Sequence, residues 1–277
     1  MNRRRFLSAG LVGSMVLTSK LLTNHSPLAD RNKLNLNVKI GHHFWNWDHA
    51  WNDAKHLDIR LRLTKETGYD GFEAKPHEIG VSAELLKQKD AFYGVQCAAI
   101  GGSVREAIDY AYAAGSHIVR SRVAKEETQQ WVEYAAERNI IIVVHNHLGN
   151  KKHPAGAIET REDLLRYLDE RPGVYAGPDT GHLALCGSDP AQTIRDLGQR
   201  CRYIHLKDIY PDAVGKCHAA KEKFCELGTG ALDLAGVLEA LQDIDYTGWI
   251  MVERDNRVAD YVRSARNMRQ VLQRFGL

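Results

Sequence analysis

The sequence predicts a (β/α)8 TIM barrel, an α/β fold in a single domain, and three observations lead to this prediction. Eight short apolar runs alternate with eight longer segments whose apolar residues recur at intervals of three and four. About 250 residues follow the N-terminal segment, which is the usual length of such a barrel. Four of the apolar runs end in residues that can bind a metal, and a barrel gathers the carboxyl ends of its strands at one mouth.

The elements can be assigned in order along the chain. The apolar runs are expected to form strands over residues 38–42, 71–74, 94–99, 117–121, 140–147, 174–177, 203–207 and 249–253. The segments between them are expected to form helices over residues 52–67, 82–91, 103–114, 125–138, 160–170, 190–199, 233–243 and 257–274. Ser103 and Asp189-Pro190 are typical helix starts, and Gly68 and Gly115 are typical helix stops. An open doubly wound sheet is the alternative, but no Gly-rich phosphate loop follows the first strand, and Gly101-Gly102-Ser103 after the third is too short a signal.

The first 29 residues are expected to form an export signal peptide, and residues 36–277 the barrel domain. Three arginines at positions 3–5 precede Phe6-Leu7 and an apolar run to about Leu22, a pattern that resembles the twin-arginine export signal. The run is interrupted by polar residues and is short for a membrane span, which needs about 20 apolar residues. Because Pro27-Leu28-Ala29 is a poor cleavage site, we expect a periplasmic or secreted protein that stays membrane-anchored if the signal is not cleaved.

Composition argues against two classes of protein. The chain has 37 basic and 35 acidic residues, but the first 29 residues hold four of the basic ones and no acid, which leaves 33 against 35. This balance gives no electrostatic case for binding nucleic acid. Five cysteines are too few and too irregularly spaced for a disulfide framework or a zinc finger. In an oxidising compartment Cys217 and Cys225 can pair, and most of the others are expected to be small core residues.

Residues at the ends of four predicted strands form a candidate metal site. His145 and His147 point the same way, because side chains alternate along a strand, and one of those ways is into the barrel. Two imidazoles are not needed to pack a strand of Ile and Val, and each would cost about 1–3 kcal/mol if buried unpaired. A single such histidine is more often a satisfied core or surface residue, but Asp179, His205 and Glu253 stand at equivalent strand ends. The predicted ligands are therefore His145, Asp179, His205 and Glu253.

Other residues near the same mouth are candidates for catalysis and substrate binding. Lys207 would need an anionic partner there, either a neighbouring carboxylate or an oxygen of the substrate. Glu73 has the same two interpretations, a structural ion pair or a contact with the substrate. His182 can bond a substrate hydroxyl or cap the segment that follows it. His43 and Trp45 belong to an aromatic loop that either binds a sugar or only covers the end of the barrel.

Four motifs together resemble the xylose-isomerase-like barrel superfamily, which includes sugar isomerases and epimerases, inosose dehydratase and endonuclease IV. The motifs are Asp179-Thr180-Gly181-His182, His205-Leu206-Lys207-Asp208, Leu227-Gly228-Thr229-Gly230, and the run from Tyr246 to Glu253. The resemblance covers roughly residues 38–275 and is strongest in the second half. It implies a divalent cation held at the ends of strands five to eight, by His145, Asp179, His205 and Glu253, and a substrate contact from His182.

The chain departs from the ketose epimerases of that superfamily at two positions. Those enzymes have a glutamate at the fifth strand, where this chain has His145, and they use two metal-bound glutamates on opposite faces of the sugar to remove and return a proton. The arginine expected six residues after the metal histidine is Pro211 here. We therefore expect Lys207 to act in its place, as an electrophile or a proton shuttle.

The expected function is metal-dependent isomerisation or epimerisation of a neutral sugar or keto-sugar, by proton abstraction next to a carbonyl. Glu253 or His147 is expected to be the base, and Lys207 or His145 to polarise the oxygen or return the proton. The alternative is a metal-dependent dehydratase or lyase acting on a keto-sugar or keto-glycoside. A non-catalytic sugar-binding barrel is a further alternative. Endonuclease IV-like cleavage is disfavoured by the charge balance and the export signal.

The site also sets expectations for cofactor and partners. Imidazoles and carboxylates favour Mn²⁺, Zn²⁺, Co²⁺ or Fe²⁺ over Mg²⁺, which prefers all-oxygen shells. Export, and the lack of a phosphate-binding loop in the sequence, favour a neutral sugar over a sugar phosphate as the small-molecule substrate. Membrane contact is expected only through the signal, and the sequence leaves open whether the chain forms a homo-oligomer.

Overall fold

The computed structural model describes residues 34–149 and 157–277, so the predicted export signal lies outside the described residues. Every element described below belongs to one compact unit of the chain, Lys33–Leu277. None of the helices in the described ranges combines the length and the apolar character that crossing a membrane would require.

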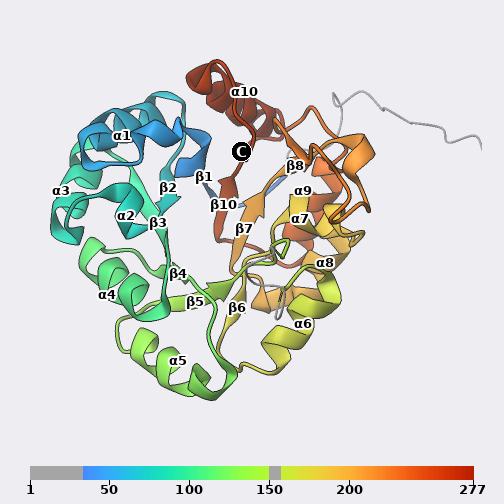
Figure 1. The fold of residues 1–277 in the computed structure, drawn as a ribbon, viewed down its shortest axis with the longest axis horizontal. Helices are drawn as coiled ribbons and strands as arrows, with labels where there is room; N and C mark the ends of the chain where they lie inside the picture. The colour runs from blue at the N-terminus through green and yellow to red at the C-terminus, as the bar shows by residue number, and fades with distance from the viewer. Residues whose placement is uncertain (1–33, 150–156) are drawn as a thin grey trace, which may run out of the picture. The chain divides into compact units, whose positions relative to one another are not determined.

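Eight parallel strands form the barrel predicted from the sequence (Figure 1). The strands are β1 (Lys39–His43), β2 (Gly71–Ala74), β3 (Gln96–Gly101), β4 (Ile118–Arg120), β5 (Ile141–Val144), β6 (Tyr175–Ala176), β7 (Tyr203–Leu206) and β10 (Trp249–Val252). Their spatial order is β6-β5-β4-β3-β2-β1-β10-β7, so each strand lies beside its neighbour in the βα sequence. The fold class is therefore confirmed.

The barrel closes between β6 and β7 through a seam made of isolated pairings. Two single parallel bridges join the strands there, Ala176 with Cys201 and Asp179 with His205. In the second bridge the His205 amide donates to the Pro178 carbonyl at 3.0 Å. The seam therefore has less continuous pairing than the other strand contacts, and it brings Asp179 and His205 side by side.

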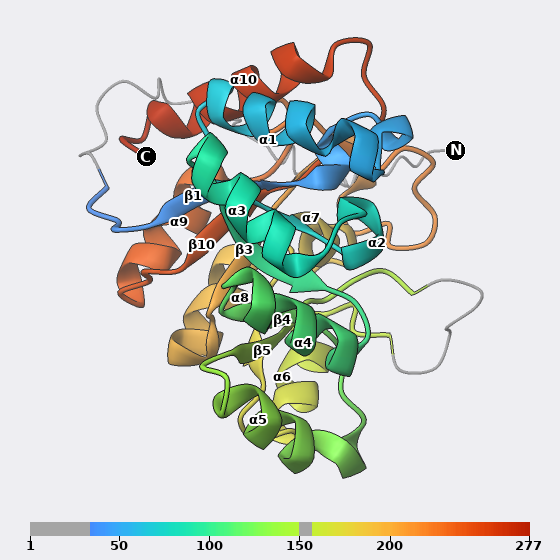
Figure 2. The same cartoon turned by 90° about the vertical axis from the view of Figure 1, so that its left-hand side faces the viewer.

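The longer helices of the described residues cover the outside of the strands (Figure 2). They are α1 (Leu57–Glu66), α3 (Ala83–Tyr93), α4 (Val104–Ala114), α5 (Thr128–Ala136), α6 (Arg161–Asp169), α8 (Pro190–Leu197), α9 (Leu234–Asp243) and α10 (Tyr261–Gln273). The two predicted helix starts are confirmed. Ser103 is the N-cap of α4, and at the start of α8 the Asp189 side chain accepts a hydrogen bond from the Ala191 amide at 2.9 Å. Gly115 ends α4 with a φ of 82°, a conformation that favours glycine.

Short elements after the strand ends are absent from the sequence-based assignment. They are the helices α2 (Pro76–Ile79) and α7 (Thr180–Leu185), the antiparallel pair β8 (Asp208–Ile209) and β9 (Phe224–Cys225), and the 3-10 turns Phe44–Asn46, His49–Trp51 and Pro211–Ala213. Three further 3-10 turns, Ala54–His56, Lys125–Glu127 and Gly198–Arg200, overlap helices that the sequence predicts. The Asp208 carboxylate organises the loop after β9, because it accepts hydrogen bonds from the amides of Gly228, Gly230 and Leu232 at 2.9–3.0 Å. These elements frame the mouth of the barrel.

Apolar side chains fill the barrel below its mouth. Ala98, Val143, Tyr203 and Met251 belong to this interior cluster and are fully or almost fully buried. Gly41 leaves room for this packing, because a Cβ there would lie 2.6 Å from the sulfur of Met251 and 3.0 Å from the Gly71 carbonyl oxygen. A closely packed floor of this kind excludes water and supports the polar side chains above it.

A buried carboxyl group at the opposite end of the barrel predicts a pH-dependent stability. Asp90 of α3 accepts a hydrogen bond from the Cys97 amide at 2.9 Å through one oxygen, and its other oxygen has no hydrogen-bond partner. Burial raises the pKa of Asp90 to about 7, although the Cys97 amide opposes the shift. The unfolded carboxyl loses its proton near pH 4 while the folded one keeps it, so stability should fall as the pH rises from about 4 to about 7.

The substitution Asp90→Asn should remove this pH dependence. We expect the variant to gain stability over the wild type as the pH rises, by about 1.4 kcal/mol for each unit of pKa difference between the folded and unfolded carboxyl. Thermal unfolding of both proteins at a series of pH values from 5 to 8 measures the difference. A constant difference across that range would contradict a raised pKa for Asp90.

Candidate functional site

Two buried asparagines fix the backbone on which the central carboxylates stand. Asn146 accepts a hydrogen bond from the Asp179 amide at 2.8 Å and donates to the Asp179 carbonyl at 3.2 Å. Asn46 donates to the Val252 carbonyl at 2.9 Å and accepts from the Arg254 amide at 2.8 Å, on either side of Glu253. The carboxylates are therefore held at defined positions before any ligand binds.

Asp179, His205 and Glu253 form a compact group at the mouth of the barrel. One ligand atom from each of the three lies within 4.8 Å of the others, and all three side chains are largely buried. In the described part of the chain Asp179 Oδ2 and His205 Nδ1 have no hydrogen-bond partner, although Asp179 Oδ2 approaches the Lys207 ammonium and His205 Nδ1 the Glu253 carboxylate. The other ring nitrogen of His205 lies 2.6 Å from Glu73 Oε2. Metal-bound histidines are commonly oriented by a carboxylate in this way, so the residues present fit a divalent cation.

His145 lies beside this group but outside it. The strand predicted over 140–147 ends at Val144, because the chain turns where Asn146 binds the backbone of Asp179, so His145 stands in the following loop. The His145 ring centroid is 5.3 Å from that of His205, and its Nδ1 lies 3.4 Å from Arg120 Nη1. Burial first and the Arg120 charge second hold the pKa of His145 well below its usual value. Its role as a ligand stays a prediction.

Lys207 contacts three carboxylates at the same mouth. Its Nζ lies 3.2 Å from Asp179 Oδ2, 3.3 Å from Glu253 Oε1 and 3.1 Å from Asp255 Oδ2. Burial opposes its charge, but Asp179, Asp255 and Glu253 outweigh burial and raise the pKa of Lys207 above its usual value. The ammonium therefore stays charged, and it shares two of its partners with the candidate metal group.

Glu73 is the centre of a buried network behind the candidate ligands. It pairs with Arg120 Nε, accepts a hydrogen bond from the Tyr203 hydroxyl at 2.7 Å, and contacts His205 as described above. His43 Nε2 lies 3.5 Å from Glu73 Oε1, the oxygen that pairs with Arg120. Burial alone would raise the pKa of Glu73, but Arg120 and His205 hold it well below its usual range. Glu73 therefore orients His205, and its contact with the substrate stays a prediction.

His182 and His147 line the side of the mouth nearest α7. Their ring centroids are 4.1 Å apart, and the Leu148 amide donates to His182 Nδ1 at 3.2 Å. His182 Nε2 is buried and has no hydrogen-bond partner among the described residues, which suits the predicted contact with a substrate hydroxyl. His147 is exposed, and its Nδ1 contacts the Leu148 carbonyl at 2.7 Å.

The aromatic loop after β1 divides between core and surface. Phe44 and Trp47 are fully buried, so these two rings cover the end of the barrel. Trp45 keeps 36% of its surface exposed and donates from its ring to Glu78 at 3.0 Å. His43 is buried, and its Nδ1 accepts a hydrogen bond from the Trp45 amide. Of these four rings, Trp45 is the one with a large exposed face.

The electrostatics of the group follow from close pairing of buried charges. Burial disfavours protonation of His205, but Glu73 and Glu253 outweigh burial and raise its pKa to about 10. Burial also opposes ionisation of Glu253, but Lys207 and His205 hold the pKa of Glu253 well below its usual value. Glu73 and Glu253 are therefore held as ionised carboxylates by the cations beside them, whereas burial raises the pKa of Asp179 despite the Lys207 ammonium.

Four residues of this site were not singled out in the sequence. Arg120 ends β4 and pairs with Glu73, Asp255 follows β10 and contacts Lys207, and Asn46 and Asn146 clamp the backbone. For Arg120 a signal was present, since a charged residue ended an apolar run as at the other strands. Asp255 and the asparagines stand in loops, where polar residues are ordinary.

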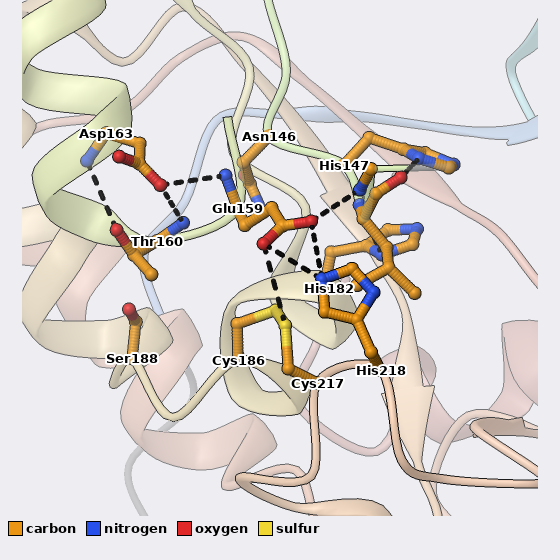
Figure 3. The surroundings of a disulfide bond; sticks show 12 residues. Asn146, His147, Glu159, Thr160, Asp163, His182, Cys186, Ser188, Cys217 and His218 are labelled. Carbon is orange, nitrogen blue, oxygen red and sulfur yellow. Dashed lines mark hydrogen bonds and ion pairs between the residues drawn. A yellow bond between two sulfur atoms is a disulfide. The ribbon is translucent and has the colours of Figure 1, made fainter. Parts of the chain in front are cut away.

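The disulfide differs from the predicted pairing. Cys217 bonds to Cys186 rather than to Cys225 (Figure 3). The Cys217 amide donates to the Leu185 carbonyl at 2.7 Å, which places its sulfur at the end of α7, whereas Cys225 is buried in β9. Cys97, Cys201 and Cys225 are buried thiols, as expected of core residues. The bond ties the helix that begins beside Asp179 to the loop between β8 and β9.

Glu159, Cys217 and His218 form a second group of potential metal ligands among the described residues. Glu159 accepts a hydrogen bond from the Gly149 amide at 2.6 Å and lies 3.1 Å from His218 Nε2. Because the Cys217 sulfur is already bonded to Cys186, it supplies no thiolate to this group.

Removing the disulfide should destabilise the protein measurably. The bond closes a loop across a sequence separation of 31 residues, which corresponds to about 3.7 kcal/mol in the chain-entropy account. We expect Cys186→Ser to lower the free energy of unfolding by that amount under oxidising conditions and to make the protein insensitive to dithiothreitol. Cys201→Ser, at a buried free thiol, is the control that keeps the response to reductant. Equal stability of oxidised and reduced wild type would contradict the expectation.

Comparison with known proteins places the chain in a family. Residues 103–273 match the family described as "Xylose isomerase-like TIM barrel". Inosose dehydratase of Clostridium botulinum (strain Eklund 17B / Type B) is 29% identical over 153 residues, 50% of this chain and 49% of that protein. Inosose dehydratase of Clostridium beijerinckii is 25% identical over 221 residues, 73% of this chain and 72% of that protein. In the first of these matches the chain spans about half the length of its relative.

Solved structures support the same fold. L-ribulose 3-epimerase superposes with a TM-score of 0.69 at 16% identity, over 86% of this chain and 94% of that one. D-allulose 3-epimerase from Methylomonas sp., solved in complex with D-allulose, superposes with a TM-score of 0.67 at 20% identity, over 88% and 99%. At such identities the likeness concerns the fold alone. Since the family match covers more than half of the sequence and the barrel is complete, the chain belongs to the xylose isomerase-like TIM barrel family.

Proposed function

We propose that the protein is an enzyme that abstracts a proton beside the carbonyl of a keto-sugar or a related cyclic polyol ketone and then eliminates a β-hydroxyl as water. The observation that carries this proposal is the group of Asp179, His205 and Glu253 at the barrel mouth, with the Lys207 ammonium beside two of its carboxylates. A fixed ammonium in a site that excludes water stabilises negative charge that develops on a carbonyl oxygen.

Asp179, His205 and Glu253 would hold a divalent cation. Such a cation supplies Lewis-acid polarisation of a carbonyl oxygen. The imidazole in the donor set favours Mn²⁺, Zn²⁺, Co²⁺ or Fe²⁺ over Mg²⁺. Glu73 supports this assignment, because its contact with His205 Nε2 leaves Nδ1 turned toward the carboxylate of Glu253.

The proposal gives Glu253, Lys207 and His182 separate roles in the reaction. Glu253 stays ionised and is the proposed base, with His147 as the second candidate. Lys207 acts as a fixed positive charge for the oxygen that gains electron density; its raised pKa makes it a weak proton donor, so the proton-shuttle role is not retained. The unpartnered His182 Nε2 would bind a substrate hydroxyl.

Elimination is preferred over epimerisation because of the residue at position 145. Epimerisation by two residues needs a second acid–base group, and His145, which stands where the ketose epimerases have a glutamate, is a weak base because burial and Arg120 lower its pKa. Elimination needs one base. The inosose dehydratases to which the sequence is similar favour the same choice. Isomerisation stays the second candidate, since a single base can return the proton it removes to the neighbouring carbon of an enediolate, whereas epimerisation would need a second proton donor.

Incubation with Mn²⁺ and a panel of keto-sugars and cyclic polyol ketones in D₂O tests the proposal. Elimination predicts products that have lost one water by mass spectrometry. Deuterium beside the carbonyl without loss of water would favour epimerisation. Ligand binding without deuterium uptake or water loss would contradict catalysis and favour a sugar-binding barrel.

We also propose export through the twin-arginine pathway. The arginines at positions 3–5 motivate this, and the Cys186–Cys217 disulfide supports it, because such bonds persist mainly in oxidising compartments. Replacing Arg4 and Arg5 together by Lys should retain the protein in the cytoplasm of its host, as measured by cell fractionation. Unchanged export of that variant would contradict the pathway.

A further inference from the structure

A basic pocket opens beside the candidate metal group, on the same mouth of the barrel. It has a volume of about 630 Å³ and lies at the carboxyl ends of β3, β4 and β5. Lys75, Arg120 and Arg122 line it together with Ser103, Ser121 and His145. None of the described residues that line it is acidic.

Arg120 links the pocket to the reaction centre. Its Nε pairs with Glu73, which contacts His205, and its Nη1 lies 3.4 Å from His145. The Arg120 side chain is only 13% exposed, so an anion that reaches it is shielded from water and held more strongly than at the surface.

Gly101 makes room for this arrangement. A Cβ at this position would lie 2.7 Å from Arg120 Nη2 and 3.4 Å from Lys75 Cγ, so the missing side chain lets both basic residues approach the end of β3. Lys75 is half-buried, and its Nζ stands 5.9 Å from the ring of Trp45, the exposed aromatic of the mouth.

A second pocket on the other side of the mouth has a different charge pattern. It has a volume of about 560 Å³, and Lys221, Lys223 and Arg257 line it together with the acidic Glu222 and Asp255. Charges of both signs therefore meet there, whereas the described residues that line the basic pocket include no acid. The acids Asp179, Glu253 and Asp255 gather around Lys207.

We propose that the substrate carries an anionic substituent, a carboxylate or a phosphate ester, which binds in the basic pocket while its carbonyl lies at the Asp179, His205 and Glu253 group. This rests on the proposed function and replaces the expectation of a neutral sugar. The anion fixes which end of the substrate enters first, and so which carbon–hydrogen bond faces Glu253.

Binding of simple probes tests the pocket without requiring turnover. Glucuronate, glucose 6-phosphate and glucose share a ring and differ in charge, and calorimetry with each measures their affinity. We expect at least one anion to bind about tenfold or more tightly than glucose, equivalent to about 1.4 kcal/mol. Preference for glucuronate assigns a carboxylate, and preference for glucose 6-phosphate assigns a phosphate.

The double variant Lys75→Met with Arg122→Gln should bring the anion's affinity close to that of glucose. Lys221→Met, at the exposed rim of the second pocket, is the matched control and should keep the preference. In the wild type the preference should also shrink as salt rises from about 0.05 M to about 0.5 M. Circular dichroism checks that the variants are folded.

Two results would overturn the inference: equal affinity for glucose and both anions, or an anion preference that survives the double variant and high salt. Failure of the proposed function looks different. Anion binding that depends on Lys75 and Arg122, without turnover on any anionic or neutral ketone, leaves the pocket assigned and refutes the reaction.

Discussion

Replacing Glu253 by Gln is expected to lower kcat by about 10²–10⁴-fold, the range typical of a lost general base. Gln keeps the size of the side chain but cannot accept the proton. It also loses the charge that faces His205 Nδ1 at 2.7 Å and Lys207 at 3.3 Å, so metal affinity should fall as well. Measuring kcat at saturating Mn²⁺, with bound metal determined by mass spectrometry, separates the two effects.

Glu222→Gln serves as the control, because Glu222 is an exposed carboxylate at the rim of the same mouth. It should leave both kcat and metal content unchanged. Retention of wild-type kcat in E253Q would remove Glu253 as the base. If His147→Gln were then inactive, the base would be His147.

Replacing Lys207 by Met is expected to destabilise the metal-free protein by about 3–5 kcal/mol, as is typical when one partner of a buried ion pair is removed. Asp179 and Glu253 would lose the ammonium that lies 3.2–3.3 Å from each. A divalent cation bound to the same two carboxylates should offset much of this loss. The Tm increase on adding Mn²⁺ should therefore be larger for K207M than for the wild type.

The control for this experiment is Lys221→Met, which removes a rim charge and should respond to Mn²⁺ like the wild type. Unchanged stability of K207M in EDTA would mean that the ammonium contributes nothing to the apo protein. An equal Tm increase in both proteins would mean that the cation and Lys207 do not share carboxylates.

The sequence was sufficient for the barrel and for most of the candidate centre, for a physical reason. Alternation of apolar strands and amphipathic helices determines a parallel sheet, and parallel strands bring their carboxyl ends together. Asp179, His205 and Glu253 meet for that reason alone, although 74 positions separate the first from the last. Lys207 follows from the same argument, because it stands two residues after His205.

The contacts that the sequence did not reveal depend on loops and on distances through space. His145 was expected on a strand, but β5 ends one residue earlier where Asn146 binds the chain at Asp179. The pairing of Cys217 depends on how the loop between β8 and β9 folds back onto α7, which spacing along the chain does not encode. Nothing in the sequence around Arg120 distinguishes it from other residues at strand ends, because its partner Glu73 is 47 positions away and becomes its neighbour only in the folded barrel.

The seam between β6 and β7 has a consequence for how the protein responds to its ion. Only isolated bridges join the two strands there, and Asp179 and His205 stand on opposite sides of one of them. A cation held by both residues would act as a cross-link at the place where the ring of strands opens most easily. In the metal-free state this seam should open transiently and show fast amide hydrogen exchange. Binding of the cation should suppress that opening, so that one binding step both prepares the site for catalysis and closes the barrel.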